Sequence, residues 1–180
     1  MIKRVRELDS NALIASKVFR DYVEKQETEI NRGISSLCIL SILIRAGNEG
    51  IHGYQILKDL EEDTNKMLVI EEGTLYPMLR KLEGDNIITS KREESGRKRK
   101  FYYVTEYGKK IFNHLAGFYS KLTEAIAPLF DVKVNLSSEK YLFCPMCANK
   151  IELTNLELRF CDVCGNNIEK ELKERGLRNE

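Results

Sequence analysis

Four of the five cysteines in this 180-residue chain form two Cys-x-x-Cys pairs, CPMC (Cys144 and Cys147) and CDVC (Cys161 and Cys164). Thirteen residues separate the pairs, and Gly165 follows the last cysteine. A Cys-x-x-Cys turn directs two thiolates at one point, and two such turns complete a tetrahedral four-sulfur site. The spacing therefore predicts a structural zinc ion that leaves no position open for a catalytic water.

Two other uses of these cysteines compete with zinc: iron in a rubredoxin-like four-sulfur site, and two disulfides if the host is a hyperthermophile. The N-terminus has no apolar segment typical of a signal peptide, which favours metal ligation over disulfides. Between the pairs, LELRF (156–160) alternates polar and apolar residues as a ribbon strand should. The segment is short for a core of its own, so the metal should supply its folding energy.

A second candidate site lies in EEGTLYPMLRKLEGDN, residues 71–86. One face of the predicted helix has the spacing of a buried stripe: Leu75, Met78, Leu79 and Leu82. The other face carries a set unusual for plain solvent exposure: Thr74, Tyr76, Pro77, Arg80 and Lys81. Hydroxyls and helix N-terminal amides suit phosphate oxygens, and an arginine such as Arg80 can contact guanine with two hydrogen bonds. This face is a candidate DNA-reading surface.

The next segment is predicted to be a basic β-hairpin, with β-prone runs at 87–90 and 101–105 around a Ser-Gly turn. Residues 91–100 contain six basic and two acidic side chains, a local charge of +4 in a chain whose net charge is +1. The hairpin residues predicted to contact the phosphate backbone of DNA are Arg97, Lys98, Arg99 and Lys100. The alternative is that these residues form an ordinary solvent-exposed basic loop. The position of the hairpin directly after the candidate DNA-reading helix favours contact with DNA phosphates.

The elements around these sites are mostly helical by periodicity. Helices are predicted at 9–31, ending at Gly33, then at 34–46, at 52–63, from about Gly73, and at 105–130 with Thr105 as its cap. Three helices followed by a hairpin are the order of a winged helix-turn-helix. The fold class is therefore mainly α with a small β wing, followed by a long helix and a small zinc ribbon.

The domain plan follows from these elements. We predict an N-terminal helix (1–32), a DNA-binding domain (33–104), a dimerisation helix (105–130), a linker (131–140), the zinc ribbon (141–166) and a charged tail (167–180). The apolar stripe of 105–130 exceeds what one small domain can cover, so a second copy should bury it. Hydrophobic residues make up 42% of the chain, and its longest apolar run is too short to span a bilayer. We expect a cytoplasmic protein without a membrane role.

Three motifs resemble the PadR family of transcriptional regulators, over about residues 33–130. They are IHGYQILKDLEE (51–62), EEGTLYPMLRKLEGDNII (71–88) and SGRKRKFYYVTEYGKK (95–110). The GTLYP stretch is the most specific of them. The resemblance implies a homodimer, most often a repressor, whose two wings reach a pseudo-palindromic operator. Some members respond to aromatic compounds, but no residues here converge to assign an effector.

Other functional classes fit the sequence less well. No P-loop, dinucleotide-binding turn, nucleophile elbow or His-Glu metal motif is present, so an enzyme is not predicted. A winged helix with a four-cysteine ribbon is similar to archaeal general transcription factor E, which acts through RNA polymerase contacts. A metal- or redox-responsive regulator is a third hypothesis. The GTLYP motif and the apolar stripe favour the sequence-specific DNA-binding regulator.

Overall fold

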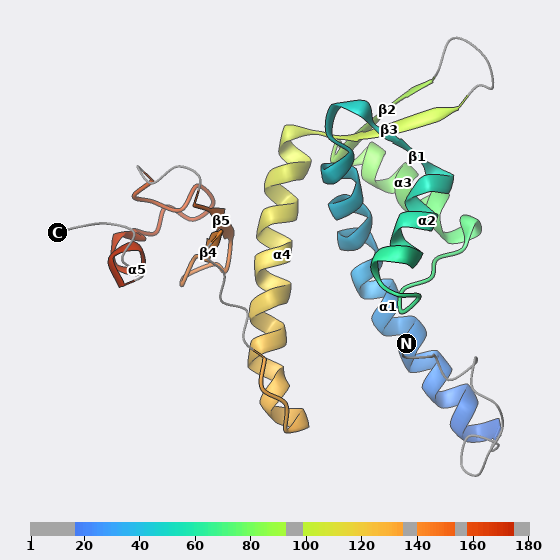
Figure 1. The fold of residues 1–180 in the computed structure, drawn as a ribbon, viewed down its shortest axis with the longest axis horizontal. Helices are drawn as coiled ribbons and strands as arrows, with labels where there is room; N and C mark the ends of the chain where they lie inside the picture. The colour runs from blue at the N-terminus through green and yellow to red at the C-terminus, as the bar shows by residue number, and fades with distance from the viewer. Residues whose placement is uncertain (1–16, 93–98, 135–139, 154–157, 175–180) are drawn as a thin grey trace. The chain divides into compact units, whose positions relative to one another are not determined.

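The computed structural model describes residues 17–92, 99–134, 140–153 and 158–174. The chain divides into two compact units, Met1–Lys109 and Lys110–Glu180. Figure 1 shows the elements of each: helices with one small sheet at their end in the first unit, and most of a long helix, a short hairpin and a short last helix in the second. The predicted class, mainly helical with a small antiparallel wing, is confirmed.

Helix α1, Lys17–Ala46, is one continuous helix, so the predicted break at Gly33 is wrong. A glycine inside a helix costs only about 1 kcal/mol relative to alanine. That cost is small beside the burial of the following turns, where Ile39, Leu40 and Leu43 are almost fully inaccessible. The predicted start of this helix at residue 9 lies outside the described residues.

The helical stretch Lys17–Glu49 is long and apolar enough to cross a membrane by length and mean hydropathy. The same stretch supplies central side chains to the core of the first unit, including Ile39 and Leu43, which are 0% exposed. The apolar residues of this stretch therefore form part of the buried core, as the sequence predicts for residues 34–46.

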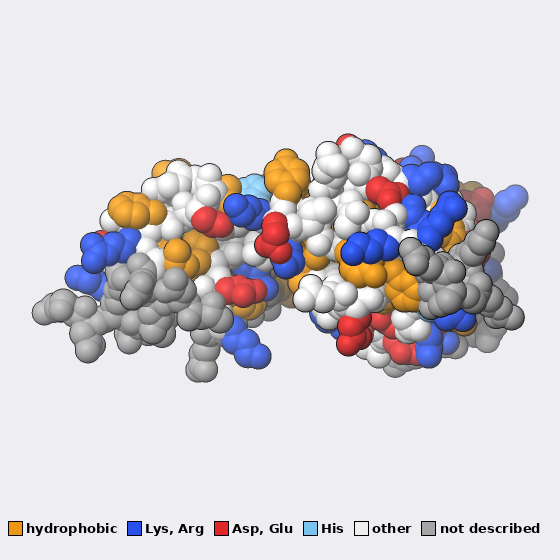
Figure 2. Space-filling view, turned by 90° about the horizontal axis from the view of Figure 1, so that it is seen from above, with side chains coloured by type: hydrophobic (Ala, Val, Ile, Leu, Met, Phe, Trp, Pro, Cys, Tyr) orange, Lys and Arg blue, Asp and Glu red, His pale blue; other side chains and the backbone are white. Residues whose placement is uncertain are grey.

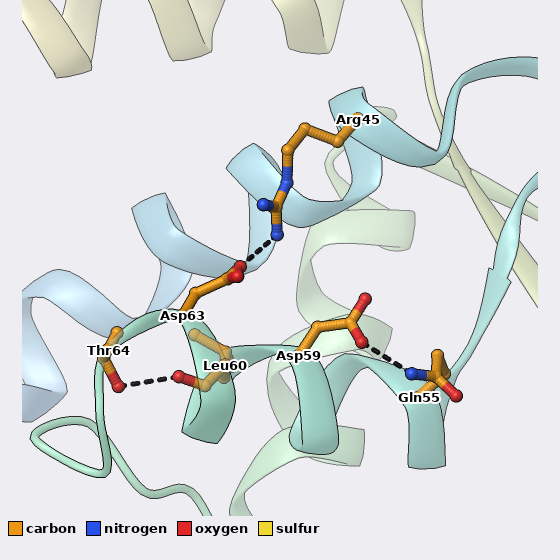
Figure 3. A network of polar contacts seen from close by, with 6 residues as sticks. All are labelled: Arg45, Gln55, Asp59, Leu60, Asp63 and Thr64. Atoms are coloured by element: carbon orange, nitrogen blue, oxygen red, sulfur yellow. Dashed lines mark hydrogen bonds and ion pairs between the residues drawn. The ribbon is translucent and has the colours of Figure 1, made fainter.

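Helices α2 (Gly53–Asp63) and α3 (Glu72–Gly84) form the helix-turn-helix pair. The backbone N–H of Gln55 donates to Nδ1 of His52, which caps α2 at 3.2 Å. At the other end of α2, Asp63 pairs with Arg45 of α1, and the Thr64 hydroxyl donates to the Leu60 carbonyl at 2.6 Å (Figure 3). The Arg45–Asp63 pair links α2 to α1, whereas the other two hydrogen bonds finish the two ends of α2.

The sheet has three antiparallel strands in the order β1-β3-β2: β1 Ile51–His52, β3 Lys100–Val104 and β2 Ile88–Arg92. Ile88 lies opposite Val104 and Arg92 opposite Lys100, so the predicted hairpin is confirmed. Its tip, residues 93–98, is outside the described residues. The largest buried side chains of this unit come from all three helices and β2: Ile39, Leu40, Leu43, Ile56, Leu60, Leu75, Leu79 and Ile88.

Helix α4 (Glu106–Ile126) begins at the cap predicted for it. The hydroxyl of Thr105 accepts a hydrogen bond from the Gly108 N–H at 2.9 Å. A 3₁₀ turn, Ala127–Phe130, continues the helix. Several large apolar side chains on α4 and this turn are exposed by 38–80%: Leu115, Phe118, Leu122, Ile126 and Leu129.

The cysteine-containing part of the second unit has two short antiparallel strands, β4 (Tyr141–Phe143) and β5 (Lys150–Glu152), and helix α5 (Glu169–Glu174). Its buried cluster joins two cysteines to apolar residues: Leu142, Cys144, Ile151, Cys161, Ile168 and Leu172. The ribbon therefore has a small core of its own, contrary to prediction. It also continues past residue 166, because α5 packs Leu172 into that core. The predicted strand 156–160 lies partly outside the described residues, and Phe160 forms a single bridge with Asn167.

Candidate nucleic-acid interface and metal centre

The two faces of α3 separate as the apolar spacing predicts. Leu75 and Leu79 are 0% exposed and Leu82 is buried, whereas Met78 is half-buried. The five candidate contact residues are all exposed: Thr74, Tyr76, Pro77, Arg80 and Lys81. Pro77 lies inside α3, in its second turn, so the Gly73 carbonyl lacks the N–H donor that residue 77 would otherwise supply. The helix can thus dock on the core and still present a polar face.

Basic side chains gather near this face. Figure 2 shows Lys and Arg side chains clustered on the first unit. Lys91 and Arg92 are exposed at the end of β2, and Arg99 is exposed just before β3. Arg97 and Lys98, two of the predicted contacts, lie outside the described residues. The described strands alone therefore bring three exposed cations to the base of the wing.

Lys100, another predicted contact, is committed to an intramolecular pair. Its ammonium lies 2.8 Å from the carboxylate of Glu83 at the end of α3 and 5.1 Å from the centre of the Tyr102 ring. The Ser90 hydroxyl of β2 donates to the same carboxylate. Hydrogen bonds, first from Lys100 and then from Ser90, hold the pKa of Glu83 below its ordinary value. Glu83 therefore ties both wing strands to α3, a role that no local sequence pattern indicated.

The four cysteines that the sequence pairs lie together in space. Their Sγ atoms are all within 4.8 Å of one another, with Cys144 to Cys164 at 3.6 Å and Cys147 to Cys161 at 3.7 Å. Four sulfurs at about 2.3 Å from one tetrahedral ion would be about 3.8 Å apart. No disulfide joins any cysteine of the described ranges. The arrangement therefore fits a single metal ion with four sulfur ligands.

Each cysteine pair is shaped by the same backbone turn. The Ala148 N–H donates to the Cys144 carbonyl at 2.9 Å, and the Gly165 N–H donates to the Cys161 carbonyl at 2.8 Å. Both donors have positive φ, 60° at Ala148 and 71° at Gly165. Glycine adopts this conformation without penalty, which explains Gly165, whereas the first turn accepts an alanine.

The electrostatics of the cysteine site favour a cation. Burial raises the pKa of the Cys147 thiol to about 12, whereas a backbone N–H of Asn166 lowers the pKa of Cys164. A buried thiol becomes a thiolate at neutral pH only if a positive charge compensates it. The buried amide of Asn149 supports the site from outside, since its Nδ2 lies 3.9 Å from Cys161 Sγ and 2.9 Å from Asp162 Oδ1.

The fold and the exposed face of α3 define a winged helix-turn-helix protein. The model of the transcriptional regulator PadR-like family matches residues 39–114. A solved transcriptional regulator from Clostridium thermocellum is 30% identical, with a TM-score of 0.51, and the match covers 54% of this chain and 94% of that one. A PadR family transcriptional regulator from Eggerthella lenta DSM 2243 is 26% identical, with a TM-score of 0.54, covering 64% of this chain and 94% of that one.

A protein of Lysinibacillus sphaericus without an assigned function is also similar, at 29% identity over 101 residues, 55% of this chain and 90% of that protein. This chain belongs to the PadR-like family of transcriptional regulators. It is thus a DNA-binding transcription regulator by class. The family match ends at residue 114, before the four cysteines, so the metal site is an addition to the matched region.

Proposed function

We propose that this protein is a homodimeric, sequence-specific repressor that acts on DNA in the cytoplasm. The observation that carries the proposal is the polar face of α3, on which Tyr76 and Arg80 are exposed beside the cations at the base of the wing. In this proposal Arg80 contacts base edges in the major groove. The phosphates are contacted by Thr74 and Lys81 of α3 and by Arg97 and Arg99 of the wing. Bound over a promoter, such a dimer would exclude polymerase.

The dimer forms through residues 105–130. Exposed apolar side chains recur along α4 at the three- and four-residue spacing of a helix seam, at Leu115, Phe118, Leu122 and Leu129. A contiguous apolar stripe of this kind supports burial against a second copy. Leu122→Glu should convert a dimer of two 20.8-kDa chains into monomers in sedimentation equilibrium. An unchanged dimer mass would place the interface elsewhere.

The cysteine site holds one structural zinc ion per chain. Four thiolates with no open position suit zinc that stabilises a fold rather than zinc that activates water. Native mass spectrometry of the protein purified without added metal should show one zinc per chain, and Cys147→Ser should reduce that content. Iron in the wild-type site would show instead as a visible charge-transfer absorption, and would replace zinc in the proposal.

The decisive test is DNA binding by the metal-loaded protein. Binding to DNA from upstream of its own gene is compared with binding to random duplex at several salt concentrations. A guanine contact is worth about 1–3 kcal/mol of discrimination, so Arg80→Ala should lower the preference for the operator about 5- to 150-fold.

The control is Lys58→Ala, which removes an exposed cation on α2 that pairs with Glu62 at 3.6 Å. That variant should keep the wild-type preference. If Arg80→Ala leaves the ratio of operator to random affinity untouched, α3 does not read bases through Arg80. A wild-type protein without any preference among upstream sequences would contradict the repressor proposal itself.

A further inference from the structure

The cysteine-containing ribbon of the second unit packs against helix α4. From Lys110 onward α4 belongs to the same compact unit as the ribbon, whose strands β4 and β5 lie beside the middle of the helix (Figure 1). A Cβ atom on Gly117 of α4 would overlap the carbonyl oxygen of Ala148 and lie 2.8 Å from the backbone nitrogen of Lys150. Gly117, which is buried, therefore lets the ribbon backbone approach α4 more closely than any other residue type would.

The backbone that meets Gly117 belongs to the first metal-binding turn. Ala148 follows Cys147 directly, and its N–H donates to the Cys144 carbonyl at 2.9 Å. The next residue but one, Lys150, lies opposite Phe143 in the β4–β5 hairpin. Because these bonds tie the turn together, a side chain at position 117 would displace the turn as a whole. Metal ligation by Cys144 and Cys147 would fix the shape of the same turn.

Phe143 makes a second contact between the ribbon and α4. Its neighbours Leu142 and Cys144 belong to the small core of the ribbon, so by alternation the Phe143 ring lies on the outer face of β4. The ring is nevertheless only 7% exposed. The ammonium of Lys121, one turn after Gly117 on α4, lies 5.1 Å from the ring centre. The residues on either side of Cys144 and Cys147 therefore form the surface that the ribbon presents to α4.

This contact borders the exposed apolar stripe of α4. Phe118 and Leu122 of the stripe directly follow Gly117 and Lys121, and they are 54% and 42% exposed. Consecutive residues are about 100° apart around a helix, so the ribbon and the stripe occupy adjacent faces of the same turns. Most helices in proteins owe their stability to packing of one face rather than to intrinsic propensity. In the described part of the second unit, the ribbon supplies this packing to the middle of α4.

We propose that the ribbon is a metal-dependent brace for the dimerisation helix. With the four thiolates ligated, the first cysteine turn packs at Gly117, and α4 stays helical and presents its stripe to a second copy. Without ligation the turn loses its shape and leaves α4, so part of the helix must be ordered again when two copies pair, which lowers dimer affinity. The inference rests on the proposed function, because it assumes a dimer through residues 105–130. It adds that metal occupancy controls the dimer and, through the dimer, operator binding.

The test measures the dissociation constant of the dimer by sedimentation equilibrium. Removing zinc from wild type with a chelator should raise this constant about 5- to 150-fold, the usual range for coupling between two sites. Gly117→Asn should raise it to a similar extent while native mass spectrometry still shows one zinc per chain. Asparagine is not a poorer helix former than glycine, so a weaker dimer would come from displacement of the ribbon. The matched control is Gly33→Asn in α1, where a Cβ meets no atom within 4 Å and the dimer should be unchanged.

Two further measurements separate a brace from a ribbon that stabilises only itself. Chelation of Gly117→Asn should add little to the effect of the substitution, because both remove the same contact. The monomeric variant Leu122→Glu should bind zinc more weakly than the wild-type dimer by the same factor, because coupling between two binding events is reciprocal. A dimer dissociation constant that is unchanged by chelation, or unchanged in zinc-loaded Gly117→Asn, would overturn the brace and leave the repressor proposal standing. A zinc-loaded wild type that is monomeric would overturn both.

Discussion

Replacing Gly108 by alanine should destabilise the first unit strongly, although alanine is the better helix former. A Cβ atom at position 108 would lie 2.1 Å from the Ile87 carbonyl oxygen and 3.0 Å from a methyl group of Val104. The carbonyl is not free to retreat, because it accepts hydrogen bonds from the Thr105 N–H at 3.1 Å and the Thr105 hydroxyl at 3.0 Å. Relief of the clash therefore separates the start of α4 from β2.

The magnitude follows from three opposing terms. Overpacking costs about 1–3 kcal/mol, and two weakened hydrogen bonds cost about 0.5–1.5 kcal/mol each. The gain in helix propensity is at most about 1 kcal/mol. The net loss in free energy of unfolding is about 3 kcal/mol, which for a unit of this size lowers the Tm by roughly 12–24 °C.

Urea unfolding followed by circular dichroism measures this difference, and Gly33→Ala is the control. Gly33 also lies in a helix, but a Cβ there meets no atom within 4 Å. That variant should gain about 0.5–1 kcal/mol. Gly108→Ala with wild-type or higher stability would show that the contact between α4 and Ile87 does not constrain this position, and the packing argument would be wrong.

Three further predictions concern the core, the wing and the metal. Leu79 is 0% exposed on the inner face of α3, so Leu79→Ala should lose about 2–5 kcal/mol in urea unfolding, whereas Lys81→Ala on the outer face should stay within about 0.5 kcal/mol of wild type. Glu83→Gln should cost about 0.5–1 kcal/mol at pH 7, because the pair with Lys100 is about one-third exposed. The pKa of Glu83 is lower in the folded protein than its ordinary value of 4.5. The stability that the charged Glu83 contributes is therefore complete above pH 4.5 and is lost as pH falls through the folded pKa. A stability difference between wild type and Glu83→Gln that grows at acidic pH would contradict the assignment. Removing the metal with a chelator should collapse the amide NMR spectrum of residues 141–174 and spare that of the first unit, and an unchanged spectrum would mean that the small core folds without an ion.

Local sequence patterns were enough to identify the two candidate sites. The inner and outer faces of α3 follow from helical spacing alone, and the hairpin follows from two β-prone runs around a charged turn. The cysteine site follows from two turns whose geometry is set within four residues each. In each case the signal is contained in neighbouring residues, because helix faces and tight turns depend on interactions between near neighbours.

Long-range packing decided the rest. The helix α1 passes through Gly33 because burial of its second half outweighs a local propensity. Glu83 meets Ser90 and Lys100 only after the hairpin folds back on α3, and Leu172 joins the cysteine core only through α5. These long-range contacts depend on which surfaces pack against one another and exclude water, which is a property of the whole folded unit.

Tyr102 illustrates the division between the two kinds of information. In the sequence it is one of two adjacent tyrosines in a strand, and alternation says only that the two point to opposite faces. The tertiary structure places Tyr102 beside Tyr76 and Arg99 at one hollow, against Lys100 of its own strand. The sequence by itself thus determined helices α2, α3 and α4, the wing and the grouping of the four cysteines, through local periodicity and spacing. Tertiary structure alone decided which distant polar groups lie together at one hollow, because that depends on the packing of three separate elements.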